Sequence, residues 1–203
     1  MKWFYEIVIG SKRKRGKLIP DDKLFDNVVD YGCENEIFKS VFMYPEDRIE
    51  EIIKNKSISN IFCSRFAYWI PVDIDKGDNS DQLTLQNART ALMSLYDNDL
   101  TEDNIFIWYS GTGYHIDIHS GCFGIEPQED YPFLIKQTMK EMLPFADLSI
   151  YTRSSIIRAP FSRNLKSNRY KIPLSSKELM SLSAEEIIAP ASSVEEVQKR
   201  ISW

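Results

Sequence analysis

Cysteine is scarce in this chain of 203 residues, and long apolar stretches are missing. Its three cysteines, Cys33, Cys63 and Cys122, are widely separated and form no C-x-x-C pair. This spacing excludes a disulfide framework and a zinc site built from cysteines, and it is typical of a reducing, cytoplasmic environment. No apolar stretch is long enough to span a membrane, and the first ten residues lack the layout of a signal peptide. We therefore expect an intracellular protein without zinc and without a membrane partner.

Acidic residues are absent from residues 148–177, although the whole chain has a net charge of -5. The mild negative balance argues against a protein that coats nucleic acid throughout. The acid-free stretch is rich in lysine and arginine, so it either suits phosphate groups or forms a solvated basic loop. A second basic run at residues 12–17 predicts a hairpin tip or a flexible loop, which is either plainly solvated or touches a nucleic-acid backbone.

Hydrophobic periodicity predicts interleaved strands and helices, and therefore an α/β or α+β protein. With 43% hydrophobic residues, the chain has enough apolar side chains for one large domain or two closely packed lobes. The predicted strands lie at residues 3–9, 59–62, 67–75, 105–109, 114–119, 156–159 and 170–174. The predicted helices lie at residues 45–56, 83–95, 131–143, 183–188 and 193–201. Residues 175–203 are expected to form a helical C-terminal tail or a connector to a further domain.

Two carboxylates end a strongly apolar predicted strand. In Val72-Asp73-Ile74-Asp75, the alternation of a strand sends Asp73 and Asp75 to one face and Ile74 toward the core. Adjacent carboxylates repel unless a cation or a proton lies between them, and a buried strand seldom ends in such a pair without a partner. Asp147 offers a third carboxylate for an oxygen-rich Mg²⁺ or Mn²⁺ site, which is the equipment of phosphoryl transfer. The alternative is a strand end that is simply exposed to water.

A glycine-rich turn, Ser-Gly-Thr-Gly-Tyr-His, separates two predicted strands. Gly111 and Gly113 allow backbone N–H groups to converge on an anion, and the hydroxyls of Ser110 and Thr112 add donors. His115 begins the next strand, where it is placed to donate to a phosphate oxygen. The plainer interpretation is a hairpin turn followed by a surface histidine.

The strand after this turn alternates between apolar and polar residues. His115, Asp117 and His119 fall on one face, which we expect to be the site face or a neighbouring patch. The same three residues raise the alternative of an H-x-D-x-H zinc site. No further ligand is evident in the sequence, which weighs against that alternative.

Three motifs follow one another in an order that resembles the archaeo-eukaryotic primase superfamily. The first is a hydrophobic-D-x-D ending at Asp75, and the second is the S-G-x-G-x-H ending at His115. The third is an acid, Asp147, followed by IIRAPFSRNLK at residues 156–166 and then a strand. This third motif is similar to that of the catalytic small subunits of replicative primases. The resemblance covers about residues 68–174, roughly half of the chain.

The resemblance implies a fold of two lobes packed around a shared cleft. The second lobe would be built on an RRM-like βαββαβ sheet, with a boundary near residues 100–105, and the catalytic domain would span residues 1–174. The resemblance also implies template-directed synthesis of nucleic acid, by priming or by polymerisation, from NTPs or dNTPs on single-stranded DNA.

The resemblance further assigns roles to individual residues. Asp73, Asp75 and Asp147 would be catalytic and would hold two divalent cations, Mg²⁺ or Mn²⁺. The residues implied to bind the incoming nucleotide are Ser110, Gly111, Thr112, Gly113, His115, Arg158, Ser162, Asn164 and Lys166. In the implied two-metal mechanism, a 3′-hydroxyl attacks the α-phosphate of the nucleotide and pyrophosphate departs.

The chain departs from the replicative small subunits at two positions. Those subunits usually carry an arginine in the glycine motif and often a histidine at the position of Asn164, and they have a zinc-binding insertion that is absent here. Thr112 and Gly113 instead resemble the motif of viral and plasmid members. We therefore expect a short primase-polymerase of a virus or mobile element, with a helicase domain or a replication protein as a partner.

Two other functions stay open at the level of the sequence. A nuclease or a repair-type polymerase of the same superfamily would use the same cations and would prefer a gapped or broken template. An RRM-like module without catalysis would bind single strands, but such modules normally present aromatic stacking pairs on the sheet. Carboxylates are predicted on this face instead, and without a cation they repel nucleic acid.

Overall fold

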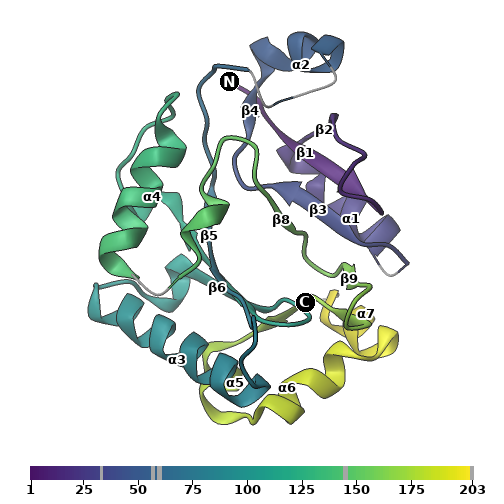
Figure 1. Cartoon of the computed structure of the whole chain (residues 1–203), viewed down its shortest axis with the longest axis vertical. Coiled ribbons are helices and arrows are strands. Elements are labelled where there is room, and N and C mark those ends of the chain that lie inside the picture. The colour runs from purple at the N-terminus through teal and green to yellow at the C-terminus, as the bar shows by residue number, and fades with distance from the viewer. Residues whose placement is uncertain (33, 56–57, 59–60, 144–145, 202–203) are drawn as a thin grey trace.

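The computed structural model describes residues 1–32, 34–55, 58, 61–143 and 146–201. The described residues form a mixed α/β protein, and every pair of strands is antiparallel. Figure 1 shows the N-terminal strands with α1 and α2 on one side of the molecule, and α3 and α4 on the other. None of the described helices is long and apolar enough to cross a membrane.

The first sheet is built mainly from the N-terminal part of the chain. Its strands are β1 (Trp3–Ile9), β2 (Lys17–Pro20), β3 (Ile37–Ser40), β4 (Tyr44–Pro45) and β8 (Ile156–Arg158). They pair in the order β2-β1-β3-β8, and β4 also pairs with β1. The accompanying helices are α1 (Leu24–Gly32) and α2 (Ile49–Asn55). Because β8 comes from far along the chain, it ties the basic stretch to the edge of this sheet.

The second sheet has four strands in the order β11-β6-β7-β5. These strands are β5 (Trp69–Ile74), β6 (Ile105–Tyr109), β7 (Tyr114–His119) and β11 (Ile172–Leu174). With α3 (Asp81–Asp97) and α4 (Tyr131–Met142), the elements of this sheet follow a βαββαβ order along the chain. The last strand, β11, lies beside β6. A separate short hairpin consists of β9 (Arg163–Asn164) and β10 (Arg169–Tyr170).

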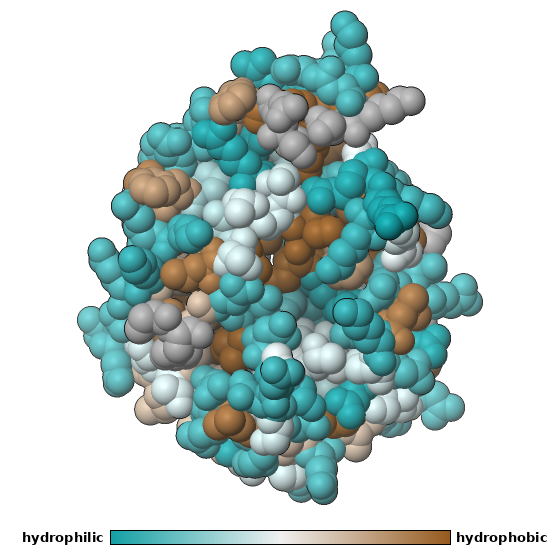
Figure 2. All heavy atoms as spheres, viewed as in Figure 1, coloured by the Kyte–Doolittle hydropathy of each residue, from teal (hydrophilic) through white to brown (hydrophobic). Residues whose placement is uncertain are grey.

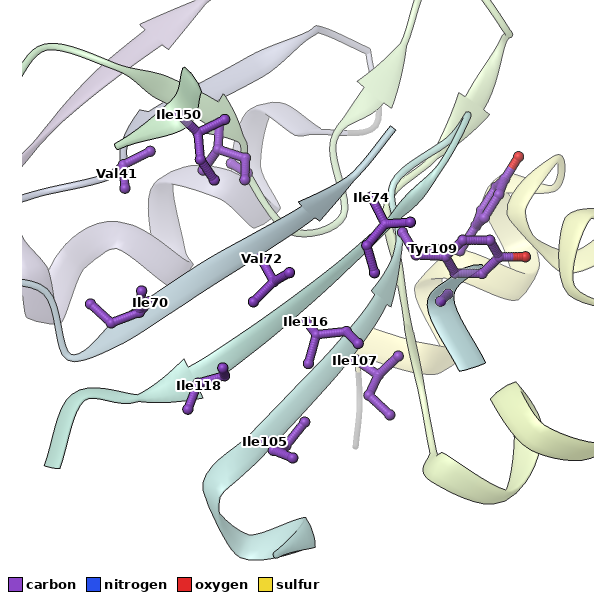
Figure 3. Close-up of a cluster of buried hydrophobic side chains, with 14 of the residues drawn as sticks. Val41, Ile70, Val72, Ile74, Ile105, Ile107, Tyr109, Ile116, Ile118 and Ile150 are labelled. Carbon is purple, nitrogen blue, oxygen red and sulfur yellow. The ribbon is translucent and has the colours of Figure 1, made fainter. Parts of the chain in front are cut away.

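Every second residue of the four-stranded sheet faces the hydrophobic core. Figure 3 shows Ile70, Val72 and Ile74 along one strand, with Ile116 and Ile118 along its neighbour. All five are 5% exposed or less, and helix α3 packs on the same core. Burying an isoleucine side chain contributes about 2 kcal/mol, so this face fixes the register of the strands. The alternate side chains therefore all lie on the opposite face.

Three short helices complete the chain. They are α5 (Ser176–Ser181), α6 (Ala184–Ala191) and α7 (Val194–Ile201). Ser175 and Ser183 each accept a hydrogen bond from the N–H of a glutamate that bonds back to the serine, a capping box that starts α5 and α6. Leu179, Ile187 and Val197 are fully buried in the main core. The helices predicted at 183–188 and 193–201 are confirmed, and both are packed on the sheet domain.

The strongest sequence patterns are confirmed to the residue. The strands predicted at 3–9, 105–109 and 114–119 have the observed bounds of β1, β6 and β7. Other bounds shift by a few residues, as where α3 begins at Asp81, one residue after its serine cap. The predicted helix 45–56 is a single 3-10 turn followed by α2, and residue 56 lies outside the described residues.

Several predicted elements need correction. Of the strand predicted at 59–62, residues 59 and 60 lie outside the described residues, and residues 61 and 62 are not in a strand. The predicted strand 170–174 is two strands, because Tyr170 pairs in the small hairpin while β11 pairs with β6. The sequence patterns missed β2, β3, α1 and α5, which are short or lack a clean period.

The two sheets do not divide the chain at the predicted boundary of 100–105. Strand β5 precedes that boundary, yet it pairs along its whole length with β7. Strand β8 follows the boundary, yet it pairs with β3 of the first sheet. The chain therefore passes between the sheets more than once, and residues from both line the space where they meet.

Candidate functional site

The pairing of β5 with β7 brings Asp73 opposite His115 on the face away from the core. The Nε2 atom of His115 lies 3.5 Å from Oδ1 of Asp73. Asp75 follows the end of β5, while Ile74 between them is buried. The predicted arrangement, with both aspartates on one side and Ile74 in the core, is therefore confirmed.

Asp147 is brought to the same place by the loop after α4. Its backbone N–H donates to the carbonyl of Asp73 at 3.1 Å. The hydroxyl of Tyr151 donates to the carbonyl of Pro71 at 2.7 Å, which holds this loop against the edge of β5. Asp147 caps a short 3-10 turn rather than ending a helix, because α4 stops at Met142. We refer to Asp73, Asp75 and Asp147 as the carboxylate cluster.

The charges of the carboxylate cluster act on one another. The pKa of Asp73 is raised to about 7, first by burial and then by the negative charges of Asp75 and Asp147, while Lys171 opposes the shift. The ionised form of a carboxylate with a raised pKa is stabilised by a cation placed between it and its negative neighbours. The fold therefore concentrates negative charge at a point where the sequence predicts a metal site.

The donors around the carboxylate cluster suit a hard cation. The cluster lines a hollow of about 400 Å³ together with Asn79, Asn87 and Thr90, whose side chains also offer oxygen atoms. An oxygen-only donor set fits Mg²⁺ or Mn²⁺ better than zinc.

The carboxylates are turned toward their own loops. Asp75 accepts from the N–H of Lys76 at 2.9 Å, and Asp147 accepts from the N–H and the hydroxyl of Ser149, both at 2.8 Å. Among the described residues, no three His, Cys, Asp or Glu side chains are gathered closely enough to hold a metal ion in this arrangement. Like charges repel one another, which favours divergence of this kind.

A cleft of about 650 Å³ lies beside the carboxylate cluster and takes most of its lining from predicted residues. We call it the candidate cleft. The predicted residues that line it are Asp73, Asp75, Ser110, Thr112, His115, Arg158, Asn164 and Lys166. Glu36 just before β3, Phe38 of β3 and Lys12 of the β1–β2 loop line it too. Figure 2 shows a face that is mostly hydrophilic, with hydrophobic residues visible in a hollow near its middle.

The glycines of the turn between β6 and β7 are needed for close packing. A Cβ atom on Gly113 would lie 2.3 Å from the carbonyl oxygen of Ile74, and one on Gly111 would lie 2.9 Å from Cβ of Asn164. Gly111 also has a φ of +98°, which favours glycine. The N–H of Gly113 donates to Oγ of Ser110 at 3.1 Å, so it is occupied within the turn. The predicted anion nest is therefore at least partly a packing device.

Arg158 enters the candidate cleft from the edge of the first sheet. It donates to Oε1 of Glu36 at 3.1 Å and to the carbonyl of Arg163 at 2.9 Å. Its guanidinium lies 5.0 Å from the centre of the Phe38 ring, and the Lys12 ammonium lies 4.7 Å from the same ring. Burial lowers the pKa of Arg158, and Glu36 opposes this shift. These contacts place positive charge across the cleft from the carboxylate cluster.

Lys171 contacts the ring of His115 at Nδ1, the nitrogen that does not face Asp73. Its ammonium is 2.9 Å from Nδ1 of His115 and donates to the carbonyl of Arg158 at 3.1 Å. Burial and the charge of Lys171 lower the pKa of His115 well below its usual value, while burial lowers the pKa of Lys171 to about 8. A neutral ring that accepts from Lys171 at Nδ1 carries its proton on Nε2. His115 is thus a donor aimed toward Asp73 and the cleft.

Ser162 was predicted to bind nucleotide, but its side chain does not line the candidate cleft. It is fully buried, and its hydroxyl donates to the carbonyls of Ala159 and Ile37 at 2.8 and 3.1 Å. It therefore fastens the segment after β8 to β3. Asn164 and Lys166 do line the cleft, and Oδ1 of Asn164 accepts from the backbone N–H of Lys166 at 3.0 Å.

Sequence reasoning missed Lys171, Glu36 and Phe38. Lys171 had a usable signal, because it is a charged residue between two apolar ones inside a predicted strand. Glu36 and Phe38 had none, since nothing in the sequence shows that their segment pairs with β8. Their positions follow from the β3–β8 pairing alone.

The basic run at residues 12–17 is confirmed as the tip of the β1–β2 hairpin. Arg15 pairs with the fully buried Glu6 and donates to the carbonyl of Ser154 at 2.9 Å, so it is structural. Lys12 reaches the candidate cleft. Only part of this run is therefore a plainly solvated loop.

No model of a known protein family matches this chain, and no curated protein matches it either. The resemblance of its motifs to those of primases therefore stays a prediction. The geometry of the candidate cleft and of the carboxylate cluster is what bears on function.

Proposed function

We propose that the chain is a metal-dependent nucleotidyltransferase that makes or extends a strand on a single-stranded DNA template. One observation carries this proposal. Asp73 and Asp75 line both the candidate cleft and the adjacent hollow, and Asp147 lines that hollow. Cationic and hydrogen-bonding side chains from distant parts of the sequence line the same cleft. A nucleoside triphosphate with bound divalent cations has the matching distribution of charge.

The residues would share the chemistry as follows. The carboxylate cluster would hold Mg²⁺ or Mn²⁺, which when bound supplies Lewis acidity at the reacting phosphate and favours the ionised form of the attacking hydroxyl. His115 would donate its Nε2–H to a phosphate oxygen. Arg158 and Lys166 would offset charge on the triphosphate, which grows as the bond to pyrophosphate breaks. Glu36 would keep Arg158 oriented until that charge arrives.

The wider prediction is a primase-polymerase fold of two lobes around a shared cleft, with an RRM-like second sheet. The βαββαβ order of the four-stranded sheet and the cleft between the two sheets support it. Single-stranded template, NTPs or dNTPs, and a helicase domain or replication protein are the partners that this activity implies. Nucleotides and template occur inside cells, so the activity also implies a cytoplasmic protein.

Primer synthesis on a circular single strand tests the proposal. The purified chain is incubated with the circle, labelled nucleotides and Mg²⁺ or Mn²⁺, with and without an annealed primer. We expect cation-dependent products, and separate NTP and dNTP reactions report the sugar preference. Products only with the primer would indicate a polymerase that needs help to start. The proposal fails if neither reaction gives products while the protein binds both cation and nucleotide.

Lys171→Met is expected to change the tautomer of His115 and to weaken nucleotide binding. Methionine keeps the length of the side chain but cannot donate to Nδ1. We expect the KM for nucleotide to rise about tenfold with a smaller change in kcat, since one hydrogen bond to a ligand is worth about 1.5 kcal/mol. Nitrogen-detected NMR of the ring is simple to assign, because the chain has only 2 histidines.

Lys166→Met is the matched control for this experiment. Lys166 lines the candidate cleft, and its backbone N–H donates to Asn164 and not to the His115 ring, so its loss should raise the KM and leave the tautomer unchanged. An unchanged Nε2–H signal in Lys171→Met would contradict the role given to Lys171.

A further inference from the structure

A second cavity, of about 570 Å³, lies between the two sheets and shares no lining residue with the candidate cleft. Its volume is within the range of sites for small molecules. Residues of the first sheet, the second sheet, α1 and α7 all contribute to its wall. It has no part in the function proposed above, and we call it the aromatic cavity.

Flat rings form much of the wall of the aromatic cavity. Trp69, Phe106 and Trp108 come from the exposed face of the four-stranded sheet, and Phe161 comes from the loop after β8. The rings of Trp69 and Phe106 lie 4.4 Å apart, and Trp108 meets Phe161 edge to face at 5.9 Å. Phe106 is 51% exposed, an unusual state for a large apolar side chain in a lined cavity. Such walls suit a planar ring that stacks.

Lys39 is a buried cation at the wall of the same cavity. It is 7% exposed, and its ammonium lies 4.5 Å from the centre of the Tyr5 ring. Among the described residues, no hydrogen-bond acceptor is in reach of that ammonium. Burial lowers the pKa of Lys39, and the charge of Asp117 opposes this shift. The residue is buried, but its ammonium is on the wall of the cavity, where an acceptor brought by a ligand can reach it.

Asp117 faces the aromatic cavity with one oxygen available. Its Oδ2 accepts from Nε1 of Trp108 at 2.9 Å, while the described residues offer no donor to Oδ1. Asp117 and Lys39 are not within ion-pair distance of each other in the described structure. The cavity therefore presents a donor and an acceptor that are separated by a gap. The edge of a planar molecule is the simplest group that could satisfy both.

The remaining charges of the aromatic cavity are already paired. Arg200 donates to Oε1 of Glu178 at 2.8 Å. With Lys39 and Asp117 also opposite in sign, the lining carries no excess charge for a phosphate. An uncharged small molecule fits this balance better than a strand of nucleic acid, whose backbone would need free cations.

We propose that the aromatic cavity binds an uncharged planar heterocycle whose edge carries a carbonyl next to a ring N–H. Lys39 donates to the carbonyl, Oδ1 of Asp117 accepts from the N–H, and the aromatic wall stacks on the ring. Guanine, uracil and thymine have such an edge. A methyl group on N3 of thymine removes the ring N–H, so N3-methylthymine leaves Oδ1 of Asp117 without a donor.

Calorimetric titration with guanosine, thymidine and N3-methylthymidine tests this proposal without any phosphate to engage the candidate cleft. We expect guanosine or thymidine to bind at least about tenfold more tightly than N3-methylthymidine, since a site built for hydrogen bonds rejects analogues that leave them unmade. Lys39→Met and Asp117→Asn should each reduce this binding by about tenfold or more. Lys140→Met, on the exposed face of α4, is the matched control and should leave binding unchanged.

Two further variants locate the binding and guard against misfolding. Phe106→Ala removes a half-exposed ring, so it should weaken binding with little effect on the melting temperature. Asp75→Asn, in the candidate cleft, should bind guanosine as the wild type does. The proposal is overturned by equal binding of all three nucleosides, by no binding of any, or by binding that survives Lys39→Met. The proposal is also overturned if guanosine binding is lost in Asp75→Asn but kept in the variants of the aromatic cavity. Binding of single-stranded oligonucleotides but not of nucleosides would overturn it as well.

Discussion

Asp73→Asn is expected to reduce metal-dependent nucleotide incorporation by about a thousandfold or more, a loss of several kcal/mol in transition-state stabilisation. Asp73 is the central member of the carboxylate cluster, because it lines both the candidate cleft and the adjacent hollow and contacts His115. Asparagine has nearly the same shape but no charge to hold a cation. Primer extension under single-turnover conditions measures the effect.

The control for this loss is Asp78→Asn. Asp78 is exposed in the turn after β5 and lines neither the candidate cleft nor the adjacent hollow, so the activity of Asp78→Asn should equal that of the wild type.

A melting curve of Asp73→Asn in the presence of a chelator adds a second readout. Because burial and two negative neighbours raise the pKa of Asp73, Asp73→Asn should melt at a higher temperature than the wild type when no cation is present. Full activity in Asp73→Asn would remove the basis of the proposed function.

Gly113→Ala is expected to destabilise the fold by about 3 kcal/mol or more, since overpacking against backbone cannot be relieved by a rotamer change. The added Cβ atom would lie 2.3 Å from the carbonyl oxygen of Ile74 and 3.2 Å from Cα of Asp75. For a chain of this length the melting temperature should fall by roughly 6–12 °C. Activity should fall too, because Asp75 must move with the strand end.

Gly77→Ala separates this steric effect from the general cost of removing a glycine. Gly77 has a φ of +51°, and nothing lies within 4 Å of a Cβ atom placed there. Its replacement should cost only about 1 kcal/mol, from backbone strain. Equal melting temperatures for the two variants would show that the turn between β6 and β7 can move away from β5.

Local patterning was sufficient to predict β5 and β7, which position Asp73, Asp75 and His115. Strand β7 alternates cleanly, so its bounds follow from a period of two, while β6 is a continuous apolar run that ends at the glycine-rich turn. The same alternation predicted that Asp73 and Asp75 leave the core together while Ile74 enters it. Strands β2 and β3 were missed because they are short, and the pairing that stabilises them is with residues distant in the chain.

The sequence by itself predicted most of the polar side chains that line the candidate cleft, and it predicted which face of β5 and β7 carries Asp73 and His115. Tertiary structure alone decided that Asp147 donates its N–H to the carbonyl of Asp73, that Lys171 holds His115, and that Ser162 is buried instead of lining the cleft. It also decided that Lys39 and Asp117 face one aromatic cavity. The reason is physical: periodicity reports how a residue is oriented within its own element, whereas contacts between distant elements depend on how whole sheets pack.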